Sequence, residues 1–383
     1  MSMEGILQNS NLKNDKIFWC KNCINMSTRP RIEFDRNGIC NACSWSKEKK
    51  TLDWGKRTEI LNTALKKNKK KKKSKYDCIV PVSGGKDGSY VAYKLKESYG
   101  LNVLTVTARP PLESDIGKKN LHNFIDQGFD HIHVSPNAKV MQKYNKAGFI
   151  LKGSPYYGWL IAIFAVVTKI AIQNNISLVF YGEDGEIEYG GSTQNKNKPF
   201  FDIDYIINNY FAGDYYQITK DLKIDKDELY WFNLDKKEFL KNNLKFTHWG
   251  FFEPWDSYRN YLFVKKKFKF SESSQGNEGT FTNFAQNDQI LFSLHMHLMY
   301  LKFGFGRATQ DAGIEIRRGA MTRDQAINLA NLYDNYFPEE HIEQILDYYE
   351  ISLEEFKQNL DKWANKDLFE KKNDRWVPKY KII

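Results

Sequence analysis

The order of apolar and polar positions along the chain predicts alternating strands and helices from residue 76 onward. Short apolar runs rich in β-branched and aromatic residues are typical of buried strands, and longer runs with helical spacing are typical of helices. The predicted strands cover residues 76–82, 103–107, 131–134 and 178–181. The predicted helices cover residues 90–97, 118–127 and 159–173. Strands that alternate with helices indicate an α/β fold with a parallel sheet.

Three further patterns surround this core. Apolar residues at helical spacing over 52–65 predict an amphipathic helix that leads into a lysine-rich run. Residues 338–371 have the pattern of polar-faced helices and are expected to form a small all-α end piece or a partner surface. The aromatic-rich stretch 249–263 is expected to pack inside the protein, with stacking on a sugar ring as the alternative.

Composition limits the class of protein. The 383 residues are 41% hydrophobic and 27% charged, as in soluble globular proteins, which excludes disorder, collagen and a disulfide-stapled miniprotein. The most apolar stretch, 159–167, is far shorter than the ~20 residues of a membrane-spanning helix. The N-terminus lacks the charged-then-apolar order of a signal peptide, so we expect a cytoplasmic protein without a membrane span.

The formal net charge of +10 raises the question of a nucleic-acid partner. Eight lysines lie within residues 66–75, so most of the excess charge belongs to one short run. Like charges repel and keep such a run extended, which favours a solvated linker or a frayed helix end. Contact with RNA or another anionic partner is the less favoured alternative.

Four of the five cysteines form two closely spaced pairs. They are Cys20, Cys23, Cys40 and Cys43. Thiols stay reduced in the cytosol, and two C-x-x-C turns at this separation are typical of one tetrahedral Zn²⁺ site with four protein ligands. Residues 31–34 are expected to form a strand and 35–38 a turn, which predicts a structural zinc ribbon. Two unrelated redox pairs are the alternative.

The turn after the first predicted strand carries the strongest chemical signal. It reads Ser-Gly-Gly-Lys-Asp-Gly-Ser over residues 83–89. A strand, a glycine-rich turn and a helix together aim backbone N–H groups and the positive end of the helix dipole at an anion. Adjacent glycines allow close approach to phosphate oxygens, Ser83 and Ser89 can donate hydroxyls, and Lys86 supplies a positive charge. The turn therefore predicts a phosphate site, although it lacks the spacing of a Walker A loop.

Other polar residues are expected at the same edge of the sheet. Ligands of open parallel sheets bind beyond the carboxyl ends of the strands, which groups the 83–89 turn with the segments after strands 103–107 and 178–181. The acidic residues after the last of these strands could hold Mg²⁺ or a substrate, or could be ordinary surface acids. They are Glu183, Asp184, Glu186 and Glu188.

The 83–89 turn resembles the PP-loop signature S-G-G-x-D-[ST]-S of ATP pyrophosphatases. Gly88 is a departure, because the family often has Ser or Thr there, and Ser89 is left as the hydroxyl donor. The resemblance implies cleavage of ATP between its α- and β-phosphates, with the turn holding the leaving pyrophosphate and with Lys86 and Asp87 in catalytic roles. The implied nucleotide-binding residues are Ser83, Gly84, Gly85, Lys86, Asp87, Gly88, Ser89, Thr107, Gly182 and Glu183.

From about Cys20 onward the chain resembles the N-acetyl sugar amidotransferases of bacterial surface-polysaccharide and nonulosonic-acid pathways. The later strings that carry the resemblance lie at residues 181–184, 188–191, 278–283, 302–309 and 314–323. The resemblance implies an adenine nucleotide alpha hydrolase-like α/β fold. The expected segments are a zinc ribbon (1–50), a helix and lysine-rich linker (51–75), a PP-loop ATP-binding domain (76–235) and a substrate-recognition and helical C-terminal region (236–383).

The same resemblance implies an AMP-forming C–N ligase that converts a sugar acetamido group to an acetamidino group. The amide oxygen would attack the α-phosphorus of ATP to give an O-adenylyl imidate, and ammonia would then displace AMP. The implied cofactors are ATP, Mg²⁺ and structural Zn²⁺. The implied partners are a glutaminase subunit and a barrel-type ammonia-channel protein, and the implied substrate is an N-acetylated nucleotide sugar. No residue is singled out as a general base.

Five residues are candidates for binding that sugar: Glu188, Tyr189, Arg307, Arg317 and Arg318. Guanidinium groups match carboxylates and phosphates, which favours a substrate site for the three arginines. Positions 307, 311 and 315 also recur every four residues, as on an ordinary helix face with ion pairs. Both interpretations remain open.

A PP-loop tRNA-thiolating enzyme is the alternative function. Such enzymes also combine a cysteine ribbon with a PP-loop, and the lysine run would suit a phosphate backbone. Sulfur transfer usually needs accessible cysteines beyond the ribbon, and only Cys78, inside the first predicted strand, is left. This shortage favours the amidotransferase.

Overall fold

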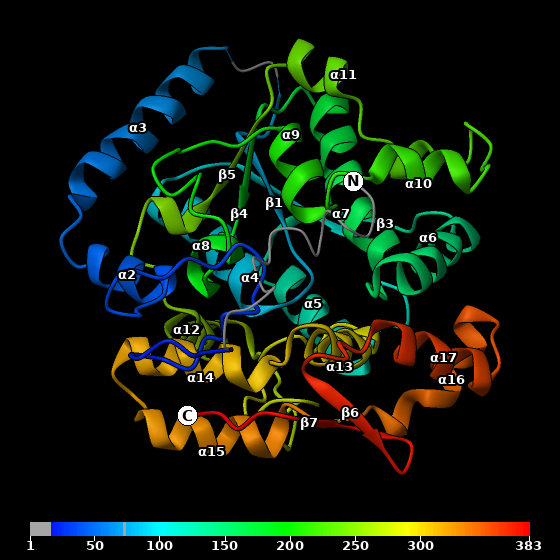
Figure 1. Cartoon of the computed structure of the whole chain (residues 1–383). Coiled ribbons are helices and arrows are strands. Elements are labelled where there is room, and N and C mark those ends of the chain that lie inside the picture. Colours follow the sequence, from blue (N-terminus) through cyan, green and yellow to red (C-terminus); the bar gives the residue numbers. More distant parts are fainter. Residues whose placement is uncertain (1–16, 72–73) are drawn as a thin grey trace.

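The computed structural model describes residues 17–71 and 74–383, and a five-stranded parallel sheet lies at its centre (Figure 1). The strands are β1 (Cys78–Pro81), β2 (Val103–Ala108), β3 (Asp130–Val134), β4 (Leu178–Tyr181) and β5 (Lys245–His248). They are ordered β3-β2-β1-β4-β5, and every pair is parallel. The strand order therefore reverses between β1 and β4, where ligands of such sheets bind. The predicted α/β fold with a parallel sheet is confirmed.

Successive residues of the central strands face two different cores. Ile79 and Leu104 pack with α6 (Ala138–Lys152) and α7 (Tyr157–Gln173) on one face. Cys78 and Val103 pack with helices on the opposite face. Those helices are α3 (Trp54–Lys71), α4 (Lys86–Tyr93), the π-helix η1 (Lys94–Ser98), α5 (Asp115–Ile125) and α12 (Ser257–Phe268). Because both faces are covered, β1, β2 and β4 are mostly apolar, which is why they could be predicted from short apolar runs.

Smaller elements complete the first face and the connection to β5. They are α8 (Gly185–Tyr189), α9 (Ile203–Tyr205), η2 (Ile206–Tyr210), α10 (Tyr215–Asp221), η3 (Tyr230–Phe232), α11 (Lys236–Lys241) and η4 (Trp249–Phe251). β5 (Lys245–His248) pairs with β4, so the sheet continues beyond residue 235, where the ATP-binding segment was expected to end. β5 is only four residues long and has one apolar side chain, Phe246, which is too little pattern to separate it from a loop.

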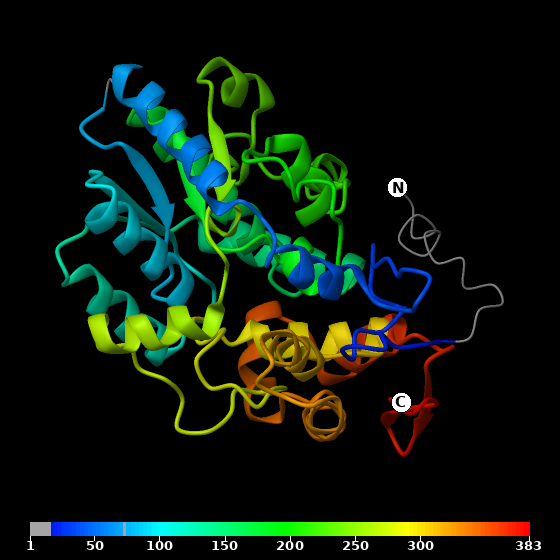
Figure 2. The ribbon, with the colours of Figure 1, turned by 90° about the vertical axis from the view of Figure 1, so that its left-hand side faces the viewer.

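A helical layer lies against the carboxyl edge of the sheet (Figures 1 and 2). It contains α13 (Leu291–Phe303), α14 (Arg307–Arg318), α15 (Arg323–Tyr333), η5 (Glu339–His341), α16 (Ile342–Tyr349) and α17 (Leu353–Trp363). The predicted all-α end piece is correct for α16 and α17 but wrong beyond them, because β6 (Phe369–Lys372) and β7 (Arg375–Pro378) form a hairpin. Asn373 and Asp374 both have positive φ, as a tight hairpin turn requires.

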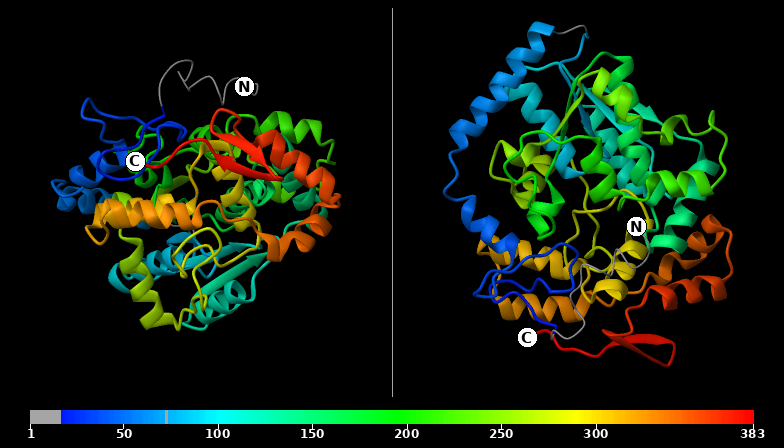
Figure 3. Two further views of the ribbon diagram at one scale, coloured as in Figure 1. Left: turned by 60° about the horizontal axis from the view of Figure 1, so that its bottom comes forward. Right: turned by 45° about the horizontal axis from the view of Figure 1, so that its top comes forward.

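The cysteine-rich segment lies beside α14 and α15 (Figure 3). The predicted strand over 31–34 is wrong: within the described part of this segment we find only two isolated bridges, Trp19–Met26 and Phe34–Cys40. Arg31 has a φ of 62°, which breaks an extended strand. α2 (Asn41–Glu48) begins directly after Cys40.

The predicted amphipathic helix over 52–65 corresponds to α3, which continues to Lys71 along the outside of the molecule (Figure 1). The first part of the lysine-rich run is therefore helical, and Lys72 and Lys73 lie outside the described residues. A search of the described helices finds none long and apolar enough to cross a membrane.

Candidate phosphate and substrate site

The turn after β1 is shaped by a glycine that no other residue could replace without strain. Gly84 has a φ of 83°, and a Cβ built on it would lie 2.4 Å from the backbone nitrogen of Leu121 in α5. The turn therefore packs directly against the backbone of a neighbouring helix. Gly85 is the N-cap of α4, so the first turn of that helix begins at Lys86. The predicted strand–turn–helix arrangement is present, with the helix starting four residues earlier than expected.

Gly88, the departure from the PP-loop signature, has a structural explanation. A Cβ on Gly88 would lie 2.7 Å from the carbonyl oxygen of Pro81 and 3.3 Å from the side chain of Val82. Helix α4 thus approaches β1 more closely than a serine or threonine at position 88 would allow.

Lys86 and Asp87 lie together at the start of α4. Lys86 Nζ is 2.5 Å from Asp87 Oδ2, and the lysine side chain is only 10% exposed. Asn260 Nδ2 of α12 donates to Asp87 Oδ1 at 3.1 Å. Asn260 is fully buried and was not predicted as a site residue, because a single asparagine in a helical pattern carries no signal of its own.

The hydroxyl groups predicted around the turn have backbone or carboxylate partners. Ser89 Oγ donates to the carbonyl oxygen of Gly85 at 2.8 Å, and Thr107 Oγ1 donates to that of Val82. Ser83 donates to the carboxylate of Asp288. Burial raises the pKa of Asp288 to about 6, although this hydrogen bond lowers it. Thr107 and Ser89 therefore shape the turn in this structure rather than point away from it.

The segment after β4 meets the turn after β1. A Cβ on Gly182 would lie 3.3 Å from Asp87 Cβ and 3.2 Å from the ring of Trp255. Burial and the negative charge of Asp87 together raise the pKa of Glu183 to about 7. Two carboxylates that approach each other between two strand ends are an arrangement that suits a divalent cation.

The other acids after β4 do not join this group. Asp184 turns into the core, where Tyr205 OH donates to its Oδ2 at 3.0 Å, and burial raises its pKa to about 7. Glu186 forms a bidentate pair with Arg31 at 2.6 and 2.8 Å. Of the four acids that could hold Mg²⁺ or a substrate, Asp184 and Glu186 are therefore engaged by protein partners in this structure. The acidic side chains before and within α8 point in different directions. Arg31 and Glu186 lie far apart in the sequence, so their pairing could not be predicted.

Glu188 is also occupied, by the cysteine-rich segment. Its carboxylate accepts from Lys49 Nζ at 2.7 Å and from Trp45 Nε1 at 2.9 Å. Asn25 donates to the carbonyl oxygen of Tyr189, and Asn41 donates to that of Gly191. The cysteine-rich segment therefore holds the whole of α8 against the sheet edge.

Arg307 is the predicted arginine that reaches the junction of sheet and helical layer. It is the first residue of α14, its Nε donates to Asp311 at 2.8 Å, and its guanidinium lies 5.7 Å from the ring centre of Tyr189. Its charge also lowers the pKa of Glu183. Thr280 and Thr282 both donate to Asp311 Oδ2. These two hydrogen bonds orient the carboxylate of Asp311, which in turn orients Arg307.

Arg317 and Arg318 do not accompany Arg307. Arg317 donates to the carbonyl oxygen of Glu188 at 3.1 Å beside the cysteines, and Arg318 pairs with Glu315 and Asp256. The three arginines are thus divided between the junction, the cysteine cluster and the surface, as residues 10 or 11 positions apart on one helix can be. The predicted i,i+4 pairing of Arg307 with Asp311 is present.

The four paired cysteines form one buried cluster. Their ligand atoms all lie within 4.8 Å of one another, with Sγ–Sγ distances of 3.9 Å for Cys20–Cys43 and 3.7 Å for Cys23–Cys40. Four sulfurs about 2.3 Å from a central Zn²⁺ would lie about 3.8 Å apart in a tetrahedron, so the cluster fits zinc. The charges of the cysteines raise the pKa of Arg317, although its burial lowers it.

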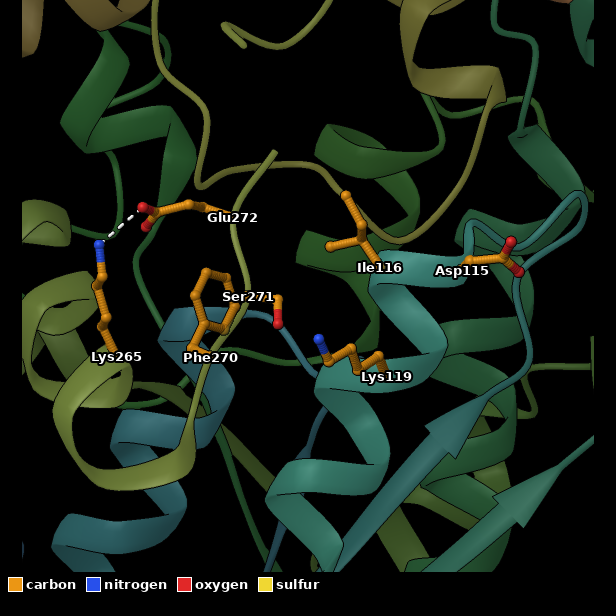
Figure 4. A pocket seen from close by; sticks show the side chains of 7 residues that line it. All are labelled: Asp115, Ile116, Lys119, Lys265, Phe270, Ser271 and Glu272. Atoms are coloured by element: carbon orange, nitrogen blue, oxygen red, sulfur yellow. Dashed lines mark hydrogen bonds and ion pairs between the residues drawn. The ribbon is translucent and has the colours of Figure 1, made fainter. Parts of the chain in front are cut away.

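A cavity of about 450 Å³ opens on the outer side of α5 (Figure 4). Lys119 and Phe270 are among its lining residues, and Lys265 and Glu272 form an ion pair at its rim. Asn120 of α5 forms two hydrogen bonds with the backbone of Ser271, which lines this cavity. Gly84 contacts the next residue of the same helix, Leu121. None of the predicted site residues lines it.

The fold and the site together define a doubly wound α/β protein with a PP-loop-type turn at the point where its strand order reverses. Residues 278–382 match the family described as "LPS biosynthesis protein WbpG-like, C-terminal domain". This match confirms that the chain resembles proteins of surface-polysaccharide biosynthesis, over the segment that contains α13 to β7.

Two solved structures are also similar to the chain. One is the NH3-dependent NAD synthetase from Campylobacter jejuni, with 16% identity and a TM-score of 0.28 over 50% of this chain and 92% of that one. The other is the U34-tRNA thiolase NcsA from Methanococcus maripaludis with its [4Fe-4S] cluster, with 15% identity and a TM-score of 0.33 over 80% of this chain and 88% of that one. No curated protein sequence matches the chain.

Proposed function

We propose that this protein is an ATP-dependent amidotransferase that converts a sugar acetamido group to an acetamidino group. The observation that carries the proposal is the junction where Lys86 and Asp87 of the PP-loop-type turn meet Glu183 and Arg307. Arg307 lies within the segment that matches an LPS biosynthesis family, so nucleotide chemistry and sugar chemistry would meet at one place.

The turn would bind the phosphates of ATP. Backbone N–H groups at the start of α4 and the ammonium group of Lys86 would hold the pyrophosphate as it leaves. Asp87 and Glu183 would hold Mg²⁺, which neutralises charge on the phosphates when it is bound. These groups stabilise developing charge by position alone, so no covalent nucleophile of the protein is required.

The chemical steps balance without a redox partner. The amide oxygen attacks the α-phosphorus, the bond to pyrophosphate breaks, and the amide N–H proton is lost, which leaves an O-adenylyl imidate. Ammonia then adds to the imidate carbon, the carbon–oxygen bond to AMP breaks, and the added nitrogen loses a proton. The product is an acetamidine in which NH replaces the original oxygen.

Arg307 and Tyr189 would bind the sugar. Asp311 accepts a hydrogen bond from Nε of Arg307 and so fixes the guanidinium group. The two terminal amino groups of Arg307 are the donors that a substrate phosphate or carboxylate would use. The Tyr189 ring lies beside that guanidinium and offers a surface for the sugar ring.

Ammonia would come from a partner glutaminase subunit through a barrel-type channel protein. All five cysteines of the chain are buried, and Cys78 lies inside β1. None of them is therefore accessible as a glutaminase nucleophile or as a persulfide carrier for tRNA thiolation.

The test is a product assay. The protein is incubated with ATP, Mg²⁺, ammonium at high pH and a panel of acetamido nucleotide sugars, and products are analysed by mass spectrometry. We expect AMP, pyrophosphate and a sugar in which NH has replaced O, and we expect none of these from Asp87→Asn. Thiolation of tRNA without any amidine product would instead support the alternative function.

A further inference from the structure

A second, much smaller cavity lies behind the segment that carries Glu183. It has a volume of about 30 Å³, enough for one or two molecules the size of water. Aromatic rings and the side chain of Ile187 line it, together with Asn195, Lys196 and Lys198 from the loop after α8. Lys198 is exposed, so the cavity is reached from the surface.

The cavity backs directly onto the proposed reaction site. Gly250 lines it, and the backbone N–H of Gly250 donates to the carbonyl oxygen of Gly182 at 3.2 Å. A Cβ on Gly250 would lie 3.8 Å from Glu183 Cα. Asp184 is among the residues that line the cavity, while the preceding residue, Glu183, interacts with Asp87, so consecutive residues of this segment border the two spaces.

The charges around the cavity are unfavourable for a cation. Arg57, Lys196 and Lys198 line it, and of these only Lys196 is paired with a carboxylate in the described part of the chain, that of Glu48 at 2.8 Å. Of its two carboxylates, Glu188 is paired with Lys49, and the other, Asp184, is buried and accepts a hydrogen bond from Tyr205. A cation entering here would meet like charges without a free carboxylate to balance them.

One polar group in the wall lacks a partner. Asn195 is 9% exposed, and its Nδ2 has no hydrogen-bond partner within the described part of the chain. An unpartnered amide N–H among the groups that line a small cavity suits a small neutral molecule with a lone pair. Burial holds the neighbouring His248 in its neutral form by lowering its pKa to about 3, so the inner wall also adds no positive charge.

We propose that this cavity is the inlet for neutral ammonia, which it delivers to the back of the Gly182–Glu183 segment while it excludes ammonium. The inference rests on the proposed function, because that reaction consumes ammonia at the opposite side of this segment. Free ammonia has a lone pair to accept from Asn195 and is the size of water, whereas protonated ammonia has no lone pair and carries the charge that the rim repels.

The test uses ammonium chloride as the nitrogen source and measures two reactions of the full-length protein. Sugar-dependent exchange of pyrophosphate with ATP reports the first step without ammonia, and amidine formation reports the second. Asn195→Leu fills the cavity and is expected to raise KM for ammonia about tenfold or more, with pyrophosphate exchange and KM for ATP unchanged. The wild-type KM, expressed as free NH3, is expected to stay constant as the pH changes.

A gain of function provides the second variant. Ile187→Ala enlarges the cavity and is expected to let methylamine replace ammonia, which gives an N-methyl amidine that the wild type forms roughly tenfold more slowly or worse. Asn359→Leu on the distant helix α17 is the matched control and should behave as wild type in both reactions.

The outcomes separate the two proposals. Absence of sugar-dependent exchange in the wild type would overturn the proposed function and with it the inlet. Normal exchange together with an unchanged KM for ammonia in Asn195→Leu and no use of methylamine by Ile187→Ala would overturn the inlet alone, and the cavity would then hold only water.

Discussion

The two loops that meet at the centre of this sheet are built in opposite ways. The turn after β1 contains its own determinants: a strand, the left-handed Gly84 and the start of α4 lie within a dozen residues. The segment after β4 depends on distant partners, because α8 is held by Arg31, Trp45 and Lys49 from the cysteine-rich segment.

This difference connects the cysteine cluster to the proposed chemistry. Helix α14 has Arg307 at its first residue, beside Glu183, and Arg317 near its end, beside the cysteines and the backbone of Glu188. The cysteine cluster therefore stabilises the β4 loop twice, through α8 directly and through α14. The β1 turn has no such contact among the contacts described above, and the two loops should respond differently to the same damage.

The largest effect is expected at the locally built turn. Lys86→Ala should lower kcat by about a thousandfold, because a preorganised charge on the leaving pyrophosphate is lost. The rate of AMP formation measures this change, and thermal unfolding checks that the fold is intact. Lys118→Ala, an exposed lysine of α5, is the control and should retain full activity. Full activity in Lys86→Ala would contradict the assignment of the turn.

Removal of a metal bound by the cysteines should show most clearly that the two loops respond differently. Chelation, or Cys23→Ser, should lower activity by about tenfold to a hundredfold, as loss of groups that orient a site does. Hydrogen exchange should speed up over residues 182–191 and stay slow in β1 and β2. The comparison would fail if exchange rose equally in both loops.

The pH dependence should reveal Glu183. Its pKa is raised to about 7 by burial and by Asp87, so the carboxylate that Mg²⁺ needs is protonated below that pH. We expect kcat/KM to rise with pH through about 7, and Glu183→Gln to lose this rise. Because the folded pKa is higher than the unfolded one, the group stabilises the fold at low pH, and this stabilisation is lost as the pH rises toward 7.

Asp184→Asn is the matched control for that profile, since burial also raises the pKa of Asp184 to about 7. It should keep the rise in kcat/KM and change only the pH dependence of unfolding. If Asp184→Asn loses the rise in kcat/KM and Glu183→Gln keeps it, the rise comes from Asp184, and the assignment to Glu183 is wrong.

The smallest effect is expected at the contact between the cysteine-rich segment and α8. Arg31→Met breaks the pair with Glu186, which is 15% exposed, and should lower activity about threefold to tenfold with about 1 kcal/mol less stability. Asp204→Asn breaks the exposed pair with Lys236 on another part of the surface and should change neither. If Arg31→Met and Asp204→Asn had equal effects, the contact of Arg31 with Glu186 would have no special role in activity.

The same contrast explains what could be predicted from the sequence. The turn over 83–89 and the central strands follow from neighbouring residues, and the cysteine cluster follows from spacing. The separate directions of Asp184, Glu186 and Glu188 do not, because their partners lie far away in the sequence. β5 was missed because four residues with one apolar side chain carry too little pattern. Asn260 and Asp288 were missed because nothing distinguishes them before the chain is folded.

The contact of Trp255 with Gly182 has a spectroscopic consequence. An indole ring that lies against Gly182, next to Asp87, is a natural fluorophore for a molecule that binds between the two loops. The chain has nine tryptophans, so the useful signal is the difference in emission between the unchanged protein and Trp255→Phe. Occupancy of the turn by a nucleotide could then be followed by light, without a label and without turnover.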